Sequence, residues 1–157
     1  MDQLESDSMK VKKEAQIFLE RVELQECIIK NKLIERKQWR DIALGITANI
    51  ETDRVQSSGT KSKMADAIDK CVDMEAEIDR QIDKLIDLKK EVLEVIEAVH
   101  SATEYMILHM RYIQYIPFKE IARRWNEEYT NITTAHGRAL ASVQRILEER
   151  AIANRTD

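Results

Sequence analysis

The sequence predicts an all-α protein, with a long antiparallel helical hairpin (a stalk) followed by a C-terminal three-helix domain. Three glycines and one proline in 157 residues leave few positions at which a helix must stop. Charged residues make up 34% of the chain, which is typical of long helices with solvated faces. We therefore expect the hairpin over residues 1–99 and a separate domain over residues 100–157.

The first helix is predicted over residues 8–44, because apolar residues recur there at three- and four-residue steps without proline or glycine. The next segment, 45–63, holds two of the three glycines together with many serines and threonines, so it is expected to be a loop. Loops of this length are often functional or mobile. The apolar residues of the first helix include Val11, Ala15, Phe18, Val22, Ile29 and Leu33.

The second helix is predicted over residues 64–99, with one long apolar stripe that Glu75 and Lys89 interrupt. Additional apolar residues widen the stripe toward what a helix pair or bundle buries. The hairpin is therefore interpreted as a dimerisation stalk, or alternatively as a docking surface for a basic protein partner such as a polymerase subunit. The stripe consists of Met64, Ile68, Cys71, Ile78, Ile82, Leu85, Val92, Ile96 and Val99, widened by Val72, Ile86 and Leu93.

The net charge of −4 is unevenly distributed along the chain, with −5 on the first hundred residues and +1 on the rest. The C-terminal part is therefore the least repulsive place for a phosphate backbone. No apolar signal core or membrane-length apolar run is present in the sequence, so we expect a cytoplasmic protein without membrane contact. Cys27 and Cys71 lie far apart and are expected to be reduced thiols.

The residues that usually mark an enzyme are missing from the sequence. Its three histidines stand in no metal-ligand spacing, and its glycines are isolated rather than gathered in a phosphate-binding loop. No nucleophile, base and orienting group can be assembled from the pattern. We therefore expect no catalytic residues, no metal and no cofactor, and we expect His136 to pack or to contact phosphate.

The C-terminal domain is predicted as three helices over residues 101–115, 117–126 and 129–150. Pro117 suits the first turn of the second helix, and Asn126 tolerates the left-handed conformation that ends it. Ala122 is small enough for two helices to cross closely, as a helix-turn-helix requires. The predicted core of this helix-turn-helix is Ile121, Ala122, Trp125, Ile132 and Ala135.

The opposite side of the last helix carries hydroxyls, an amide and a guanidinium, which are groups that read base edges in the major groove. Glu127 and Glu128 would repel phosphates, although they stabilise the start of the helix. The predicted base-reading residues are Tyr129, Thr130, Asn131, Thr133, Thr134 and Arg138, and the predicted phosphate contacts are Lys119, Arg123, Arg124 and Arg145.

A second set of basic residues lies in the segment predicted as a loop. Arg54, Lys61 and Lys63 form either a further nucleic-acid or partner contact or part of a flexible hairpin loop, and the sequence leaves both interpretations open.

The runs LHMRYIQYIPFKEIARRWN and TAHGRALASVQRIL resemble region four of bacterial sigma factors, although Tyr115 stands where those proteins usually have glycine. With the segment DRVQSSGTKSKM and the acidic second helix, the chain resembles phage late-gene transcriptional regulators of the RinA/ArpU type. The resemblance implies a sequence-specific activator of phage or prophage late genes that binds double-stranded DNA, in which we expect a homodimer. The alternative is a helical adaptor that binds RNA polymerase or a phage packaging component, with only incidental DNA contact.

Overall fold

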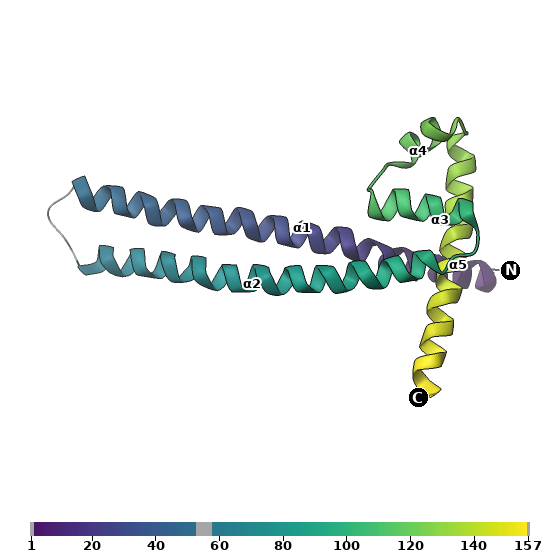
Figure 1. Ribbon diagram of the computed structural model, residues 1–157, viewed down its shortest axis with the longest axis horizontal. Coiled ribbons are helices and arrows are strands. Elements are labelled where there is room, and N and C mark those ends of the chain that lie inside the picture. Colours follow the sequence, from purple (N-terminus) through teal and green to yellow (C-terminus); the bar gives the residue numbers. More distant parts are fainter. Residues whose placement is uncertain (1, 53–57, 157) are drawn as a thin grey trace. The chain divides into compact units, whose positions relative to one another are not determined.

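The computed structural model describes the backbone of residues 2–52 and 58–156 and the side chains of residues 13–45, 59 and 61–155. These parts of the chain are helical apart from short connections and contain no strand, which confirms the all-α class (Figure 1). The helices are α1 (Asp2–Thr52), α2 (Ser58–Glu97), α3 (Ala102–Leu108), the π-helical turn η1 (His109–Ile113), α4 (Phe118–Trp125) and α5 (Tyr129–Thr156).

The chain divides into two compact units, Leu24–Ile86 and Met1–Glu23 together with Asp87–Asp157. This division runs through α1 and α2, whereas the sequence suggested a boundary at residues 99 and 100. The reason is that the first part of α1 and the last part of α2 both contact α5. The amide of Gln144 lies 3.5 Å from the Glu14 carboxylate, and Arg150 donates to the Glu94 carbonyl at 3.3 Å.

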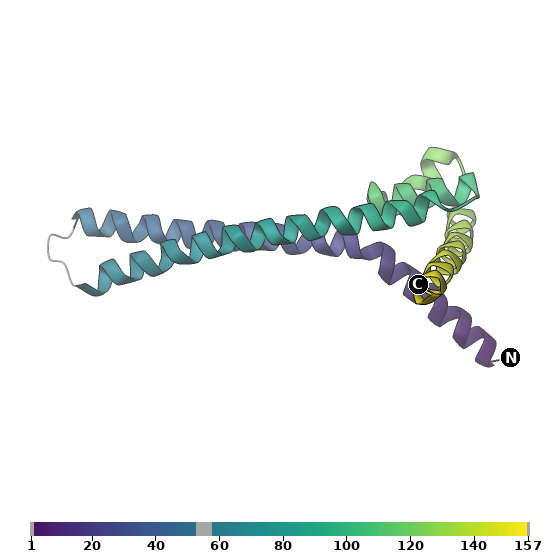
Figure 2. The same ribbon diagram turned by 60° about the horizontal axis from the view of Figure 1, so that its bottom comes forward.

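In the Leu24–Ile86 unit, α1 and α2 lie side by side and run in opposite directions (Figures 1 and 2). The amide of Gln25 donates to Oε1 of Gln81 at 2.7 Å, and Lys32 pairs with Glu77 at 3.7 Å. Residue numbers on α2 fall as those on α1 rise, which defines an antiparallel register.

The seam between these two helices follows the seven-residue repeat of a coiled coil. On α2 it contains buried Ala67, Met74 and Ile78, at steps of three and four residues when Cys71 is included. Gln25, which is 2% exposed, places a hydrogen-bonded amide within this apolar seam. A polar pair at one seam position favours a single register, because a shifted register would leave the amide unpaired.

The single apolar stripe predicted on the second helix is in fact two stripes. Ile68 and Ile82 each follow a seam residue by one position, which turns them about 100° around the helix. Together with Val72 and Ile86, they form a second stripe that is exposed in this chain. Sequence spacing alone merged the two stripes because each has the same repeat.

The loop predicted over residues 45–63 is wrong for residues 45–52 and 58–63, because α1 continues to Thr52 and α2 begins at Ser58. Gly45 lies within α1, where glycine costs only about 1 kcal/mol relative to alanine. Serine and threonine are also tolerated within helices, and no proline stops either helix. Residues 53–57, including Arg54, lie outside the described part of the chain.

The segment that leads into α4 reverses direction in a few residues. The Gln114 N–H donates to the His109 carbonyl at 3.1 Å, closing the wider π-helical turn. Tyr115 then has φ 57°, the left-handed conformation that glycine adopts most easily. Pro117 is extended and immediately precedes α4, so it caps the helix rather than occupying its first turn.

Candidate functional site

Helices α4 and α5 are joined by a three-residue turn, residues 126–128. Asn126 has φ 52° and ψ 43°, which confirms the left-handed end predicted for the helix before it. The Glu127 N–H donates to the Ala122 carbonyl at 2.9 Å, and the Glu128 carbonyl accepts from the Asn131 N–H at 3.0 Å. The turn therefore satisfies backbone groups at the end of α4 and at the start of α5.

A small buried cluster fixes which side of α5 faces inward. Ile121 is fully buried, Ala122 and Ile132 are nearly so, and Trp125 packs against them while partly exposed. Ala135 is half-buried and lies outside this cluster. Three further members of the cluster were not predicted from the sequence, because the π-helical turn and the left-handed Tyr115 break the periodicity before α4. They are Met110, Ile116 and Phe118.

The residues predicted to read bases occupy the outer side of the first turns of α5. Thr130, Asn131, Thr134 and Arg138 are exposed, and Tyr129 is 49% exposed. Thr133 is half-buried and its hydroxyl donates to the Thr130 carbonyl at 3.1 Å, so it is the least available of the set. We call Tyr129, Thr130, Asn131, Thr134 and Arg138 the polar face of α5.

The polar face spreads over two edges of the helix. Asn131, Thr134 and Arg138 border a hollow of about 310 Å³ whose wall includes Thr103 and Ile107 of α3. Tyr129 borders a different hollow, of about 340 Å³. The other residues that line this second hollow are Arg111, Pro117, Phe118 and Lys119.

Two carboxylates restrain the polar face from within. The amide nitrogen of Asn131 donates to Oε2 of Glu127 at 3.0 Å, and the Thr130 hydroxyl lies 3.5 Å from Oε2 of Glu128. The amide nitrogen carries a second hydrogen, and its oxygen accepts independently. Glu127 therefore orients the Asn131 amide while leaving one donor and one acceptor for another molecule.

Glu120 binds both arginines that were predicted to contact phosphate on α4. Arg123 donates to its carboxylate at 2.8 and 2.6 Å, and Arg124 donates at 2.9 Å. These hydrogen bonds, those from Arg123 foremost, lower the pKa of Glu120 to about 2. The carboxylate therefore stays charged and offsets part of the positive charge of the two arginines.

The other predicted basic contacts lie in separate places. Lys119 is exposed beside Tyr129. Arg145 is exposed farther along α5, where it borders a hollow with Ala98 and His100. Lys61 and Lys63 are exposed near the start of α2, in the Leu24–Ile86 unit.

Arg111 is a basic residue of this site that the sequence analysis missed. Its guanidinium lies 5.6 Å from the centre of the Phe118 ring and 5.8 Å from that of Tyr112. It lines the same hollow as Lys119 and Tyr129. A basic residue beside an aromatic one, just before the turn to α4, was the feature of the sequence that could have indicated Arg111 as a basic residue of the site.

His136 lies on the inner side of α5 and packs against η1 and α4. Its Nε2 lies 2.7 Å from the Tyr112 hydroxyl, and its ring centre lies 4.7 Å from that of Phe118. Burial, with a smaller contribution from the charge of Arg111, lowers the pKa of His136 to about 4. The ring is therefore neutral near pH 7 and acts as a packing residue.

Comparison of the chain with protein-family models, with curated proteins and with solved structures finds no match. The resemblance to phage regulators therefore depends on the sequence motifs alone. Within the described residues, no cluster of three or more histidine, cysteine, aspartate or glutamate side chains is arranged to hold a metal ion. No helix in the same residues is long and apolar enough to cross a membrane.

Proposed function

We propose that this protein is a sequence-specific, DNA-binding transcription regulator whose α4–α5 pair acts as a helix-turn-helix. The observation that supports this most directly is the polar face of α5, which is exposed while Ile132 on the opposite side is buried against α4. Because the buried side fixes the rotation of α5 about its axis, the polar face points in a fixed direction. A helix needs such a fixed orientation in order to read base edges in the major groove.

The side chains of the polar face have suitable chemistry for this task. Asn131 carries a donor and an acceptor for adenine, Arg138 can donate twice to guanine, and the Thr134 methyl group can contact thymine. Lys119 and Arg111, which line the same hollow as Tyr129, are the better-placed phosphate contacts, because Glu120 occupies Arg123 and Arg124.

The hairpin of α1 and α2 acts in this proposal as the stalk that brings two copies together. A dimer presents two reading helices to two half-sites about one DNA turn apart, or a multiple of it. By the motif resemblance, we propose that the regulated genes are phage or prophage late genes, which the protein activates in the cytoplasm.

The test is selection of the purified protein on random duplex DNA at about 50 and about 200 mM salt, with sequencing of the retained fraction. The proposal predicts one enriched motif, and a dimer predicts two related half-sites. The matched control is the Asn131→Ala variant, which should retain binding but lose preference at one position. Retention without any enriched sequence, lost uniformly as salt rises, would rule out base reading.

A second function, a helical adaptor for RNA polymerase or a packaging component, is favoured by one observation. Exposed Glu127 and Glu128 stand at the start of α5, where they oppose a phosphate backbone. Binding of nuclease-treated protein to purified RNA polymerase tests this alternative. Binding that is lost on substitution of both glutamates by glutamine would support it, whereas no binding would exclude the polymerase version.

A further inference from the structure

The Leu24–Ile86 unit exposes more large apolar side chains than its seam buries. Among its described side chains, five hydrophobic residues are buried, namely Ile29, Ala43, Ala67, Met74 and Ile78. Nine large ones are exposed, and a surface of this kind usually marks an interaction site. They are Leu24, Leu33, Ile34, Ile42, Leu44, Ile68, Val72, Ile82 and Ile86.

Six of these nine residues share a position relative to the seam, each following a seam position by one place. The six seam positions that they follow are Lys32, Ala43, Ala67, Cys71, Gln81 and Leu85. In an antiparallel pair of right-handed helices, this step turns the side chains of both helices toward the same side of the pair. We call this surface the second face of the hairpin. Its apolar members are Leu33 and Leu44 on α1, and Ile68, Val72, Ile82 and Ile86 on α2.

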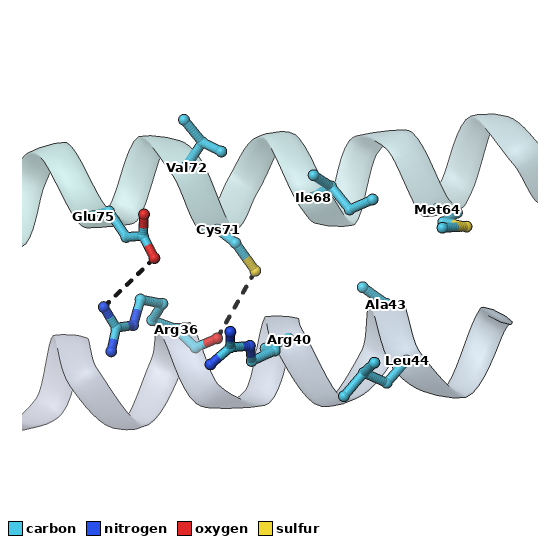
Figure 3. Close-up of a pocket in the computed structure, with 9 residues that line it drawn as sticks. All are labelled: Arg36, Arg40, Ala43, Leu44, Met64, Ile68, Cys71, Val72 and Glu75. Atoms are coloured by element: carbon cyan, nitrogen blue, oxygen red, sulfur yellow. Dashed lines mark hydrogen bonds and ion pairs between the residues drawn. The ribbon is translucent and has the colours of Figure 1, made fainter. Parts of the chain in front are cut away.

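One end of the second face forms a groove between the helices (Figure 3). The groove has a volume of about 270 Å³, and Leu44, Ile68 and Val72 line it together with the small side chain of Ala43. Val72 points away from α1 in this view. A groove beside exposed apolar side chains is the arrangement that accepts a side chain from a neighbouring helix.

The charges of the second face differ between its two helices. On α1, Lys37 and Arg40 lie between the two leucines and are basic, and so is Lys30, on the turn before the first leucine. On α2 the positions between the two apolar pairs are acidic, at Glu75 and Asp79. The face therefore has one mainly basic edge, which only Glu26 interrupts among its described charged positions, and one acidic edge, which is a self-complementary pattern.

We propose that a second copy of this chain covers the second face, so that two hairpins form a four-helix bundle with α1 of each copy against α2 of the other. A twofold axis along the bundle produces this contact and joins basic to acidic edges. The other twofold arrangement, in which α1 contacts α1, places lysines against lysines and is disfavoured. The bundle specifies the surface of the proposed dimer and forms without DNA.

The register assigns one specific pair across the dimer. Within the chain, Lys32 pairs with Glu77 at 3.7 Å. Lys30 and Asp79 are each two positions farther toward the same end of the hairpin, so they lie at the same height along the hairpin axis. Both are exposed at outer positions of the second face, and no ion pair joins either of them to another described side chain. In the bundle, Lys30 of one copy faces the partner's Asp79, twice.

The test is sedimentation equilibrium of the full chain without DNA, comparing the wild-type protein with Lys30→Asp and Asp79→Lys. Each variant alone places two like-charge pairs in the dimer, and its dissociation constant should rise about tenfold. An equimolar mixture of the two variants should recover wild-type affinity, because both pairs in the mixed dimer are then oppositely charged. Repulsion within a single chain is the same in the mixture and cannot explain recovery.

The control is Ile34→Lys, since Ile34 is 58% exposed on the side of α1 away from this face and its replacement should leave dimerisation unchanged. Val72→Lys, on the face itself, should weaken the dimer at least as much as the charge variants. A wild-type chain that stays monomeric at micromolar concentration, or a mixture that fails to recover, would overturn the proposal. Since DNA is absent throughout, failure of the DNA-reading proposal would leave these results unaffected.

Discussion

The Tyr112 hydroxyl lies 2.7 Å from Nε2 of His136, which joins the π-helical turn to the second turn of α5. Burial raises the pKa of the Tyr112 hydroxyl well above its ordinary value, and burial also lowers the pKa of His136 to about 4. Both groups are therefore neutral near pH 7. The pair holds α5 against the turn that supports Arg111, so it positions the candidate site without belonging to its exposed face.

The stability of this protein should fall as pH drops from about 6.5 to about 4. An unfolded histidine has a pKa near 6.5. The unfolded chain therefore binds a proton in this window that folded His136, with its pKa of about 4, does not. The contribution is fully present above the unfolded pKa, and its loss is of the order of 2 kcal/mol after discounting for partial exposure. Urea unfolding measured across this pH range reports it.

Two variants separate this histidine from other acid-sensitive groups. His136→Gln should be less stable than wild type at pH 7 but should lose less stability between pH 6.5 and pH 4. His100→Gln changes an exposed histidine and should keep the wild-type slope. Equal slopes in all three proteins would contradict the assignment to His136.

Asn126→Ala should destabilise the protein by about 1 kcal/mol, because alanine is strained at the φ of 52° that ends α4. Asn126→Gly should be as stable as wild type or slightly more so, since glycine adopts this conformation without a Cβ penalty. Chemical denaturation of the three proteins measures the difference. If alanine and glycine behave alike, the left-handed turn is not what this residue provides.

Part of the local backbone chemistry was predictable from the sequence, whereas side-chain pairing was not. Asn126 was identifiable because few residues other than glycine tolerate a left-handed conformation. The helical course of Gly45 was missed because glycine marks a loop only when other signals agree with it. The two arginines that Glu120 binds look available in a linear sequence, since spacings of three and four residues permit pairing without requiring it.

Glu120→Gln should increase affinity for DNA of any sequence by about threefold at low salt, because it releases Arg123 and Arg124 from a shared carboxylate. The gain should shrink as salt rises, since exposed charges are screened. Fluorescence anisotropy with one specific and one scrambled duplex measures both effects. Glu149→Gln, which removes a charge farther along α5, is the matched control and should change affinity less.

Asn131→Ala and Lys119→Ala should produce opposite patterns of lost binding. The first removes a base-reading amide, so it should relax preference at one base pair and cost about 1–3 kcal/mol on the preferred site alone. The second removes a phosphate contact, so it should weaken all sequences equally and reduce the salt dependence by about one counterion. Titrations of both variants against the selected duplex and its single-base mutants, at two salt concentrations, separate the patterns. A uniform loss for Asn131→Ala would show that the amide held by Glu127 does not read bases, and the polar face of α5 would then need another partner.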